Sequence, residues 1–246
     1  MMATAKDTPQ PDLERRLACS DSHAAGVRDM FDRIAPTYDT LNHLLSAGID
    51  VRWRKLAIET LATRPEGPIL DSCAGTMDLT AMLAKRWPNE RIVASDFAAQ
   101  MLEAGKQKAP LAERIVADAM AMPFDAESFA AVICGFGMRN LSDARRGVRE
   151  ARRVLKKGGI FTTLEFFRPM SAATKLFHGI YGNVVLPTVG GIISGDRSAY
   201  AYLTQSMQHF VSRPEYEALC SAEGFRVTSA KDLTFGIASL VVAEAV

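Results

Sequence analysis

The sequence predicts an α/β fold with a seven-stranded, mostly parallel and doubly wound β-sheet whose last strand is antiparallel. From residue 68 onward, short apolar runs alternate with segments of helical periodicity, and several of the runs end in an acidic residue. Such alternation is typical of parallel strands joined by crossover helices. Near the C-terminus two apolar runs follow each other without room for a helix, so we expect them to pair antiparallel.

The expected elements begin with a flexible arm over residues 1–25. Residues 26–62 show helical periodicity and are expected to form a helical cap. The strand-like runs that follow are PILDSC, RIVASDF, RIVADA, SFAAVICGF and KKGGIFTTLEFF. The intervening helical segments are DLTAMLAKRW, AAQMLEAGKQK and a helix from about Asp143 to Lys156.

The C-terminal part of the chain departs from this alternation. SRPEYEALCSAEGF predicts a helix, with Pro214 near its start and Gly224 just past its end. RVTSAKDL and FGIASLVVAEAV predict the two closing strands. Residues 170–212 fit neither pattern, and we interpret them as an insertion on the substrate side of the molecule after the fifth strand. Residues 26–246 are expected to form one domain.

Composition narrows the functional classes. The 246-residue chain is 48% hydrophobic and carries a formal net charge of +1, so its overall charge does not favour nucleic acid. Its four cysteines form no CxxC pair, which favours buried thiols in a reducing cytosol over a disulfide framework. No residue spacing indicates a metal site. Neither a signal peptide nor a membrane-spanning run is evident, so we expect a cytoplasmic protein, peripheral to a membrane at most.

The turn after the first predicted strand is where a ligand is expected, because ligands of such folds bind where the strand order reverses. The turn reads DSCAGTM over residues 71–77 and contains one glycine. A dinucleotide-binding turn would read G-x-G-x-x-G to bring the backbone against a pyrophosphate. The turn is therefore poorly suited to a diphosphate.

Acidic residues end the first three predicted strands. These are Asp71, Asp96 and Asp118. A carboxylate at the second strand end can accept two ribose hydroxyls, and an acidic side chain at the third can meet the amine of an adenine. Together they favour a cofactor with an adenosine but no phosphate, and S-adenosyl-L-methionine fits because its sulfonium needs no cationic clamp. Acids are common in loops, so this signal is of moderate specificity.

Longer motifs resemble those of a known family. They are MFDRIAPTYDTLNHLLSAGIDVRWRK, ASDFAAQML, ADAMAMPF, GFGMRNLSD, RRVLKKGG and LEFFRP, followed by VLPTVGGIIS and AYAYLTQSM. From about residue 26 to 240 the chain resembles the C-methyltransferases of ubiquinone and menaquinone biosynthesis. The resemblance implies a class I, Rossmann-like methyltransferase that carries a methyl group from S-adenosyl-L-methionine to a ring carbon of a polyprenyl quinol.

The resemblance also implies where the cofactor would bind. Asp71 would shape the first turn near the methionine amino group, Asp96 would meet the ribose, and Asp118 would lie near the adenine. The complete set of implied cofactor residues is Asp71, Gly75, Thr76, Asp96, Phe97, Asp118, Ala119 and Gly135. The family tends to have a serine at the position of Gly135, so one polar contact is absent from this chain.

Met77 departs from the family's first turn, which resembles D-x-x-G-G-T-G-D. Two interpretations are open. A positive φ at Met77 would cost about 1–2 kcal/mol of strain, whereas a place in the first turn of the following helix would cost nothing. We favour the second, because Met77 and Asp78 open a helical run and methionine is a good helix former.

The chemistry requires that a phenol lose a proton and that the ring carbon, methyl group and sulfur be aligned. The resemblance suggests that Arg139, Asn140 and Tyr38 hold a water that accepts this proton. Arginine is no base at neutral pH, but it can stabilise a phenolate. Two of these residues also have a structural alternative: an ion pair for Arg139 and core packing for Tyr38.

Further residues are candidates for the substrate side of the site. They are Asn42, Tyr200 and His209, of which His209 is also a weaker candidate for a direct base. Apolar residues within 186–193 are expected to form the polyprenyl wall, or alternatively the core of a lid or a homodimer interface.

Two other functions stay open at this point. The same fold could methylate another small phenol or amine, or it could serve as a binding protein that no longer catalyses.

Overall fold

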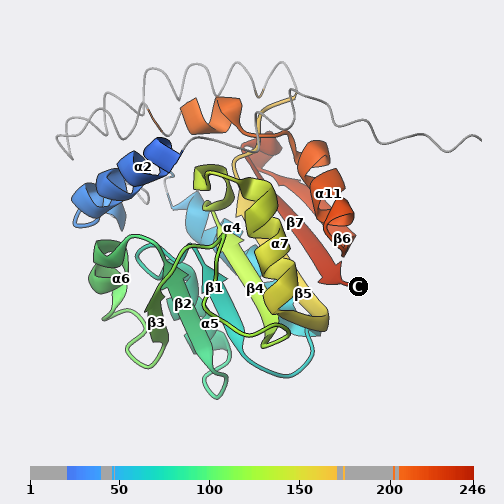
Figure 1. The fold of residues 1–246 in the computed structure, drawn as a ribbon, viewed down its shortest axis with the longest axis horizontal. Coiled ribbons are helices and arrows are strands. Elements are labelled where there is room, and N and C mark those ends of the chain that lie inside the picture. The colour runs from blue at the N-terminus through green and yellow to red at the C-terminus, as the bar shows by residue number, and fades with distance from the viewer. Residues whose placement is uncertain (1–20, 40–45, 47, 171–173, 175–201, 203–204) are drawn as a thin grey trace, which may run out of the picture.

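A computed structural model describes residues 21–39, 46, 48–170, 174, 202 and 205–246 (Figure 1). Its centre is one seven-stranded sheet in the order β3-β2-β1-β4-β5-β7-β6. The strands are β1 (Ile69–Ser72), β2 (Ile92–Asp96), β3 (Glu113–Val116), β4 (Phe129–Gly135), β5 (Leu155–Glu165), β6 (Phe225–Leu233) and β7 (Ala238–Ala245). The first five pair in parallel and β7 pairs antiparallel with both neighbours, which confirms the predicted sheet.

The strand order reverses between β1 and β4. From β1 the chain moves outward to β2 and β3, and then returns to place β4 on the other side of β1. The helices that flank this sheet are α4 (Ile49–Glu59), α5 (Asp78–Arg86), α6 (Ala99–Gly105), α7 (Ala144–Val154) and α11 (Arg213–Ala222). Because β1 and β4 diverge into opposite halves of the sheet, a crevice opens above their carboxyl ends.

Two apolar cores lie on the two faces of the sheet. On one face α7 and α11 pack through residues such as Val148 and Leu219 against Val132 of β4. On the other face α4, α5 and α6 pack through residues such as Ala57, Leu83 and Leu102. The sheet is thus covered on both sides, which explains why its central strands β1, β2 and β4 are almost wholly buried.

The predicted cap over residues 26–62 is only partly a cap. Its first half, α2 (Asp21–Ile34), lies over the carboxyl edge of the sheet, where Asp32 Oδ1 accepts the backbone N–H of Gln100 at 3.1 Å. Its second half, α4, is a core helix: Trp53 and Ala57 are buried against the sheet. Helical periodicity is the same in both cases, so sequence alone could not separate them.

The C-terminal helix and hairpin agree closely with the sequence. In α11, Ser212 and Glu215 form a capping box, Pro214 lies in the first turn, and Gly224 follows the helix with a φ of 87°. The described cysteines, Cys73, Cys134 and Cys220, are free thiols, and Cys19 lies outside the described residues. Among the described helices, none has the length and apolar character that a membrane crossing would need.

Candidate functional site

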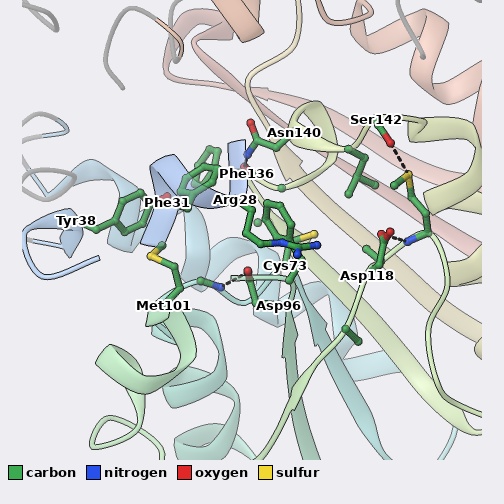
Figure 2. Close-up of a pocket in the computed structure, with 18 residues that line it drawn as sticks. Arg28, Phe31, Tyr38, Cys73, Asp96, Met101, Asp118, Phe136, Asn140 and Ser142 are labelled. Carbon is green, nitrogen blue, oxygen red and sulfur yellow. Dashed lines mark hydrogen bonds between the residues drawn. The ribbon is translucent and has the colours of Figure 1, made fainter. Parts of the chain in front are cut away.

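A pocket lies at the carboxyl ends of β1, β2 and β4 (Figure 2). Its floor comes from the turn after β1 and from the ends of β2 and β4, and one wall comes from the segment after β3. Arg28, Phe31 and Tyr38 reach it from α2 and the residues that follow. The pocket therefore occupies the place where the strand order reverses, as the sequence predicted.

Asp96 is fixed at the floor of this pocket. Its Oδ2 accepts the backbone N–H of Gly75 at 2.8 Å, and its Oδ1 accepts that of Ala98 at 2.9 Å. Burial is the main cause that raises the pKa of Asp96 to about 6, against the lowering effect of these two N–H groups. Each oxygen keeps a further lone pair that can accept a hydroxyl from a ligand.

Asp71 lies below the same turn and is wholly buried. Thr80 donates its hydroxyl to Asp71 Oδ2 at 2.6 Å, but Oδ1 has no hydrogen-bond partner in the described structure. Burial raises the pKa of Asp71 to about 7. An orphaned buried oxygen carries an unmet demand for a donor. Asp71 was predicted to contact the cofactor but does not line the pocket, so a cationic N–H group of a ligand would have to reach beneath the turn to meet Oδ1.

The wall after β3 carries the third acid. Asp118 lines the pocket and accepts the backbone N–H of Met120 at 2.8 Å, while Ala119 beside it is buried and apolar. Phe97 follows Asp96 and also lines the pocket. This side thus offers an acid and apolar surfaces, which suits the edge and faces of an adenine.

Met77 corrects our sequence interpretation. It is not part of the helix but its N-cap, with a φ of 66° and a ψ of 26°, in the left-handed region. The helix begins one residue later, because Met77 N–H closes a turn on Ala74 O while Met77 O accepts from Ala81. The strained interpretation is therefore the correct one. The side chain is wholly buried in the core and does not line the pocket, so it does not crowd a ligand there.

Replacing Met77 by glycine is expected to destabilise the protein despite relieving this strain. Relief is worth about 1–2 kcal/mol, whereas emptying the volume of a buried methionine costs about 2–5 kcal/mol. Denaturant unfolding measures the difference. The control is Glu127→Gly, since Glu127 has a φ of 54° but is exposed, so that change is expected to be stabilising or neutral. A more stable Met77→Gly protein would contradict this account.

Thr76 was predicted to contact the cofactor, but the structure directs its hydroxyl elsewhere. Thr76 Oγ1 donates to Asp39 Oδ1 and is not part of the pocket lining. Lys108 Nζ then joins Asp39 and Asp78 at 2.5 and 2.6 Å. These contacts tie the segment after α2 to the turn after β1. The Thr76 hydroxyl therefore has a structural role, which the sequence motif of the turn does not reveal.

Gly135 lines the pocket at the end of β4. A Cβ built on it would come within 2.5 Å of Leu79 Cδ1. The neighbouring leucine therefore already fills the space that a serine side chain would need. Glycine at position 135, where the family tends to have serine, therefore goes together with close packing of Leu79 of α5 against this position.

Arg139 and Asn140 play different parts. The Arg139 side chain is 4% exposed and pairs with the fully buried Glu165, with 2.7 Å between Nη1 and Oε1. It does not line the pocket, whereas Asn140 does (Figure 2). Arg139 Nη1 and Asn140 Nδ2 both donate to Phe136 O, at 2.6 and 3.2 Å. The structural alternative for Arg139, a buried ion pair, is thus what the structure shows, and its contact with the pocket is indirect.

Other predicted substrate-side residues have mixed outcomes. Tyr38 lines the pocket and meets Phe31 edge-to-face, with 6.1 Å between ring centres. His209 does not reach the pocket: it is exposed, and its Nδ1 bonds Gln205 O at 2.8 Å within its own helix. Asn42 and Tyr200 lie outside the described residues.

Sequence reasoning missed several residues of the site. Glu165 ends β5 with an acid, so the rule applied to the first three strands could have found it. Tyr202 OH donates to Asn140 Oδ1 at 3.2 Å, whereas the sequence prediction named Tyr200, the other tyrosine of AYAYL. Arg28, whose guanidinium lies 5.6 Å from the ring centre of Phe97, gave no signal in its polar helical context.

Comparison with known sequences decides the family. The model of the ubiE/COQ5 methyltransferase family matches residues 19–244. The chain belongs to this family. It is 41% identical over 225 residues to the ubiquinone/menaquinone biosynthesis C-methyltransferase UbiE of Geobacter sulfurreducens, covering 89% of this chain and 88% of that protein. It is 42% identical over 219 residues to the demethylmenaquinone methyltransferase of Thermus thermophilus, covering 87% and 99%.

Solved structures of low sequence identity share the fold. A SAM-dependent methyltransferase of Thermotoga maritima, described as a possible histamine N-methyltransferase, has a TM-score of 0.65 at 17% identity, covering 89% of this chain and 99% of that chain. Geranyl diphosphate C-methyltransferase from Streptomyces coelicolor has a TM-score of 0.58 at 14% identity, covering 78% of each chain. The fold is therefore that of the class I methyltransferases, as predicted.

This ubiE/COQ5-family methyltransferase uses S-adenosylmethionine, and the pocket fits that cofactor. Asp96 would hold the ribose, Asp118 and Phe97 would flank the adenine, and the orphaned Oδ1 of Asp71 suits the methionine ammonium group. When bound, the cofactor supplies an electrophilic methyl group on its sulfonium. The residues that line the pocket would bind and orient it, and they include Phe31 of α2 and Tyr38, which follows α2.

Cofactor binding and stability are expected to respond to pH in opposite directions. The folded protein holds protons on Asp71 and Asp96 up to pKa values of about 7 and 6, above the 3.8 of a free aspartate. The folded state therefore binds more protons than the unfolded chain, and the stability of the cofactor-free protein falls as pH rises between about 4 and 7. Calorimetric affinity for S-adenosylmethionine should rise over about pH 5–8, because its cationic groups favour ionised carboxylates. Affinity that falls as pH rises would contradict these roles.

Proposed function

We propose that this methyltransferase transfers a methyl group from S-adenosylmethionine to a ring carbon of a polyprenyl quinol in menaquinone or ubiquinone biosynthesis. The proposal is supported by the names of relatives about 40% identical over most of the chain, which act in these pathways. The observation that carries it is structural: Asn140 lines the same pocket as Asp96, with the Arg139–Glu165 ion pair directly behind it.

Polar groups that could assist a phenol converge on one corner of this pocket. Asn140 Oδ1 accepts a hydrogen bond from the hydroxyl of Tyr202, and Tyr38 lines the same pocket as Asn140. We assign to Asn140 and Tyr38 the holding of a water that takes the phenolic proton. Arg139 acts through its neighbour as a positioning residue, because both side chains share the carbonyl of Phe136. Its charge also favours an anion forming at this corner.

The proposed substrate is lipophilic and resides in a membrane. We therefore also propose that the protein makes a peripheral contact with that membrane. The cytoplasmic location and the homodimer remain predictions from the sequence. The alternative function, methylation of a phenol or an amine of another pathway, would use the same cofactor site. It would differ only in the molecule that accepts the methyl group.

Mass spectrometry of the quinones in cells that lack this protein tests the proposal. We expect a quinone without the ring methyl group to accumulate, and wild-type protein to restore the methylated form. The matched control is complementation with an Asp96→Ala variant, which is expected to leave the demethylated quinone in place. An unchanged quinone profile in the deletion strain would overturn the proposed substrate.

A further inference from the structure

Phe235 projects into solvent from the turn between β6 and β7. It is 99% exposed and sits in the single turn of 3₁₀ helix η4 (Thr234–Gly236). Thr234 and Phe235 both have positive φ angles, 45° and 57°. Such angles are outliers for β-branched and bulky residues and cost of order 1–2 kcal/mol each. The chain thus holds an aromatic ring in water on a strained backbone, which invites a functional explanation.

The turn is braced by two elements from elsewhere in the sequence. Trp53 of α4, itself buried, donates its indole N–H to Thr234 Oγ1 at 2.9 Å. Thr174 Oγ1 donates to Phe235 O at 3.1 Å. Two hydrogen bonds therefore tie the turn that carries Phe235 to other parts of the chain.

The braced turn lies at the same edge of the sheet as the pocket. Just past the turn, Ser239 of β7 is paired with Glu165 at the carboxyl end of β5. Glu165 is the residue that holds Arg139 behind the pocket. Met170, which follows β5 at this edge, is also 65% exposed. Two apolar side chains, Phe235 and Met170, are thus exposed at the carboxyl edge of the sheet, where the pocket also lies.

Positive charge accompanies these apolar side chains. Arg52 and Lys55 flank Trp53 on the exposed face of α4, and Lys231 is exposed on β6. Within the described ranges none of the three has a salt-bridge partner. The nearby acid Asp232 is already paired with Arg213 at 2.9 Å. An apolar tip among unneutralised cations matches the surface of a bilayer with anionic headgroups.

We propose that the β6–β7 turn docks the catalytic edge onto an anionic phospholipid bilayer, with the ring of Phe235 inserted at the interface. The aromatic ring supplies apolar area at headgroup depth, and the cations on α4 and β6 supply electrostatic attraction. The purpose of this surface rests on the proposed function, because a polyprenyl quinol resides in the bilayer. Docking would bring its ring to the pocket without passage through water.

Vesicle flotation with phosphatidylglycerol and phosphatidylethanolamine tests the docking surface. The variant is Phe235→Asn, since asparagine tolerates the left-handed conformation and should keep the fold. The control is Leu111→Asn, because Leu111 is 97% exposed but precedes β3 at the opposite edge of the sheet. We expect Phe235→Asn to weaken vesicle binding about tenfold or more, and Leu111→Asn to bind like wild type.

Two results would overturn the proposal: vesicle binding by Phe235→Asn equal to wild type, or an equal loss in both variants. Sedimentation of the same proteins measures their oligomeric state. It would reveal a different role for Phe235, in which the residue packs against another copy of the chain and its replacement changes only the oligomeric state. That outcome would also overturn membrane docking.

Turnover separates this inference from the proposed function. With a short-chain quinol in solution, Phe235→Asn is expected to match wild type, because the residue is remote from the cofactor contacts. With a long-chain quinol in vesicles, its rate should fall in step with vesicle binding. If wild type methylates no quinol but Phe235 still governs vesicle binding, the proposed substrate fails while the docking surface stands.

Discussion

Replacing Asp96 by alanine is expected to abolish detectable binding of S-adenosylmethionine in calorimetry. The carboxylate of Asp96 faces the pocket with lone pairs left for two ribose hydroxyls. Hydrogen bonds to a charged group contribute about 1.5–3 kcal/mol each, so losing two weakens binding by roughly a hundredfold to twenty-thousandfold. Asp118→Ala, at the exposed adenine wall, is expected to cost far less.

The alanine variant also removes the acceptor of two backbone N–H groups, so unfolding must be followed in parallel. Asp96→Asn keeps an acceptor for one of them and serves as the second variant. Both proteins are expected to remain folded at the temperature of the titration and to bind the cofactor poorly. Near-normal affinity in either variant would contradict the assignment of Asp96 to the ribose.

Replacing Arg139 by methionine is expected to remove turnover and to destabilise the fold at once. The change leaves the carboxylate of Glu165 buried and without its cation, and breaking a buried pair in this way costs about 3–5 kcal/mol. A loss of activity in this single variant would therefore not distinguish catalysis from unfolding.

The double variant Arg139→Met, Glu165→Gln makes that distinction. The two oxygens of Glu165 accept the backbone N–H groups of Arg139 and Phe166, and a neutral glutamine keeps an acceptor for one of them. Because no buried charge is left without a partner, we expect part of the stability to return. Cofactor affinity should be normal, while the rate of methyl transfer stays about a hundredfold or more below wild type, because the charge behind Asn140 is missing. Full turnover in a stable double variant would make the ion pair purely structural.

The fold was largely predictable because it rests on patterns that the sequence repeats. Apolar runs ending in acids at Asp71, Asp96 and Asp118 predicted the first three strands and the edge of the sheet that holds the pocket. The connection between the last two strands is too short for a crossover helix, and this predicted their antiparallel pairing. These features depend on periodicity and on connection length, which a single sequence displays directly.

The site was less predictable where function depends on the direction of a side chain. Thr76 turns to Asp39, and Arg139 turns away from the pocket to Glu165; both contacts join residues far apart in the sequence. Met77 adopts a positive φ because the tight turn beneath Asp96 needs it, and the burial of its side chain offsets the strain. Helix propensity alone pointed the other way at this residue.

Methyl transfer from S-adenosylmethionine with a deuterated methyl group to a demethylated polyprenyl quinol tests the central claim most directly. With purified protein, mass spectrometry and NMR of the product should find the label on a ring carbon, with no label when Asp96→Ala replaces wild type. Label on a quinol oxygen, or no transfer to any quinol by a protein that binds the cofactor tightly, would contradict the account.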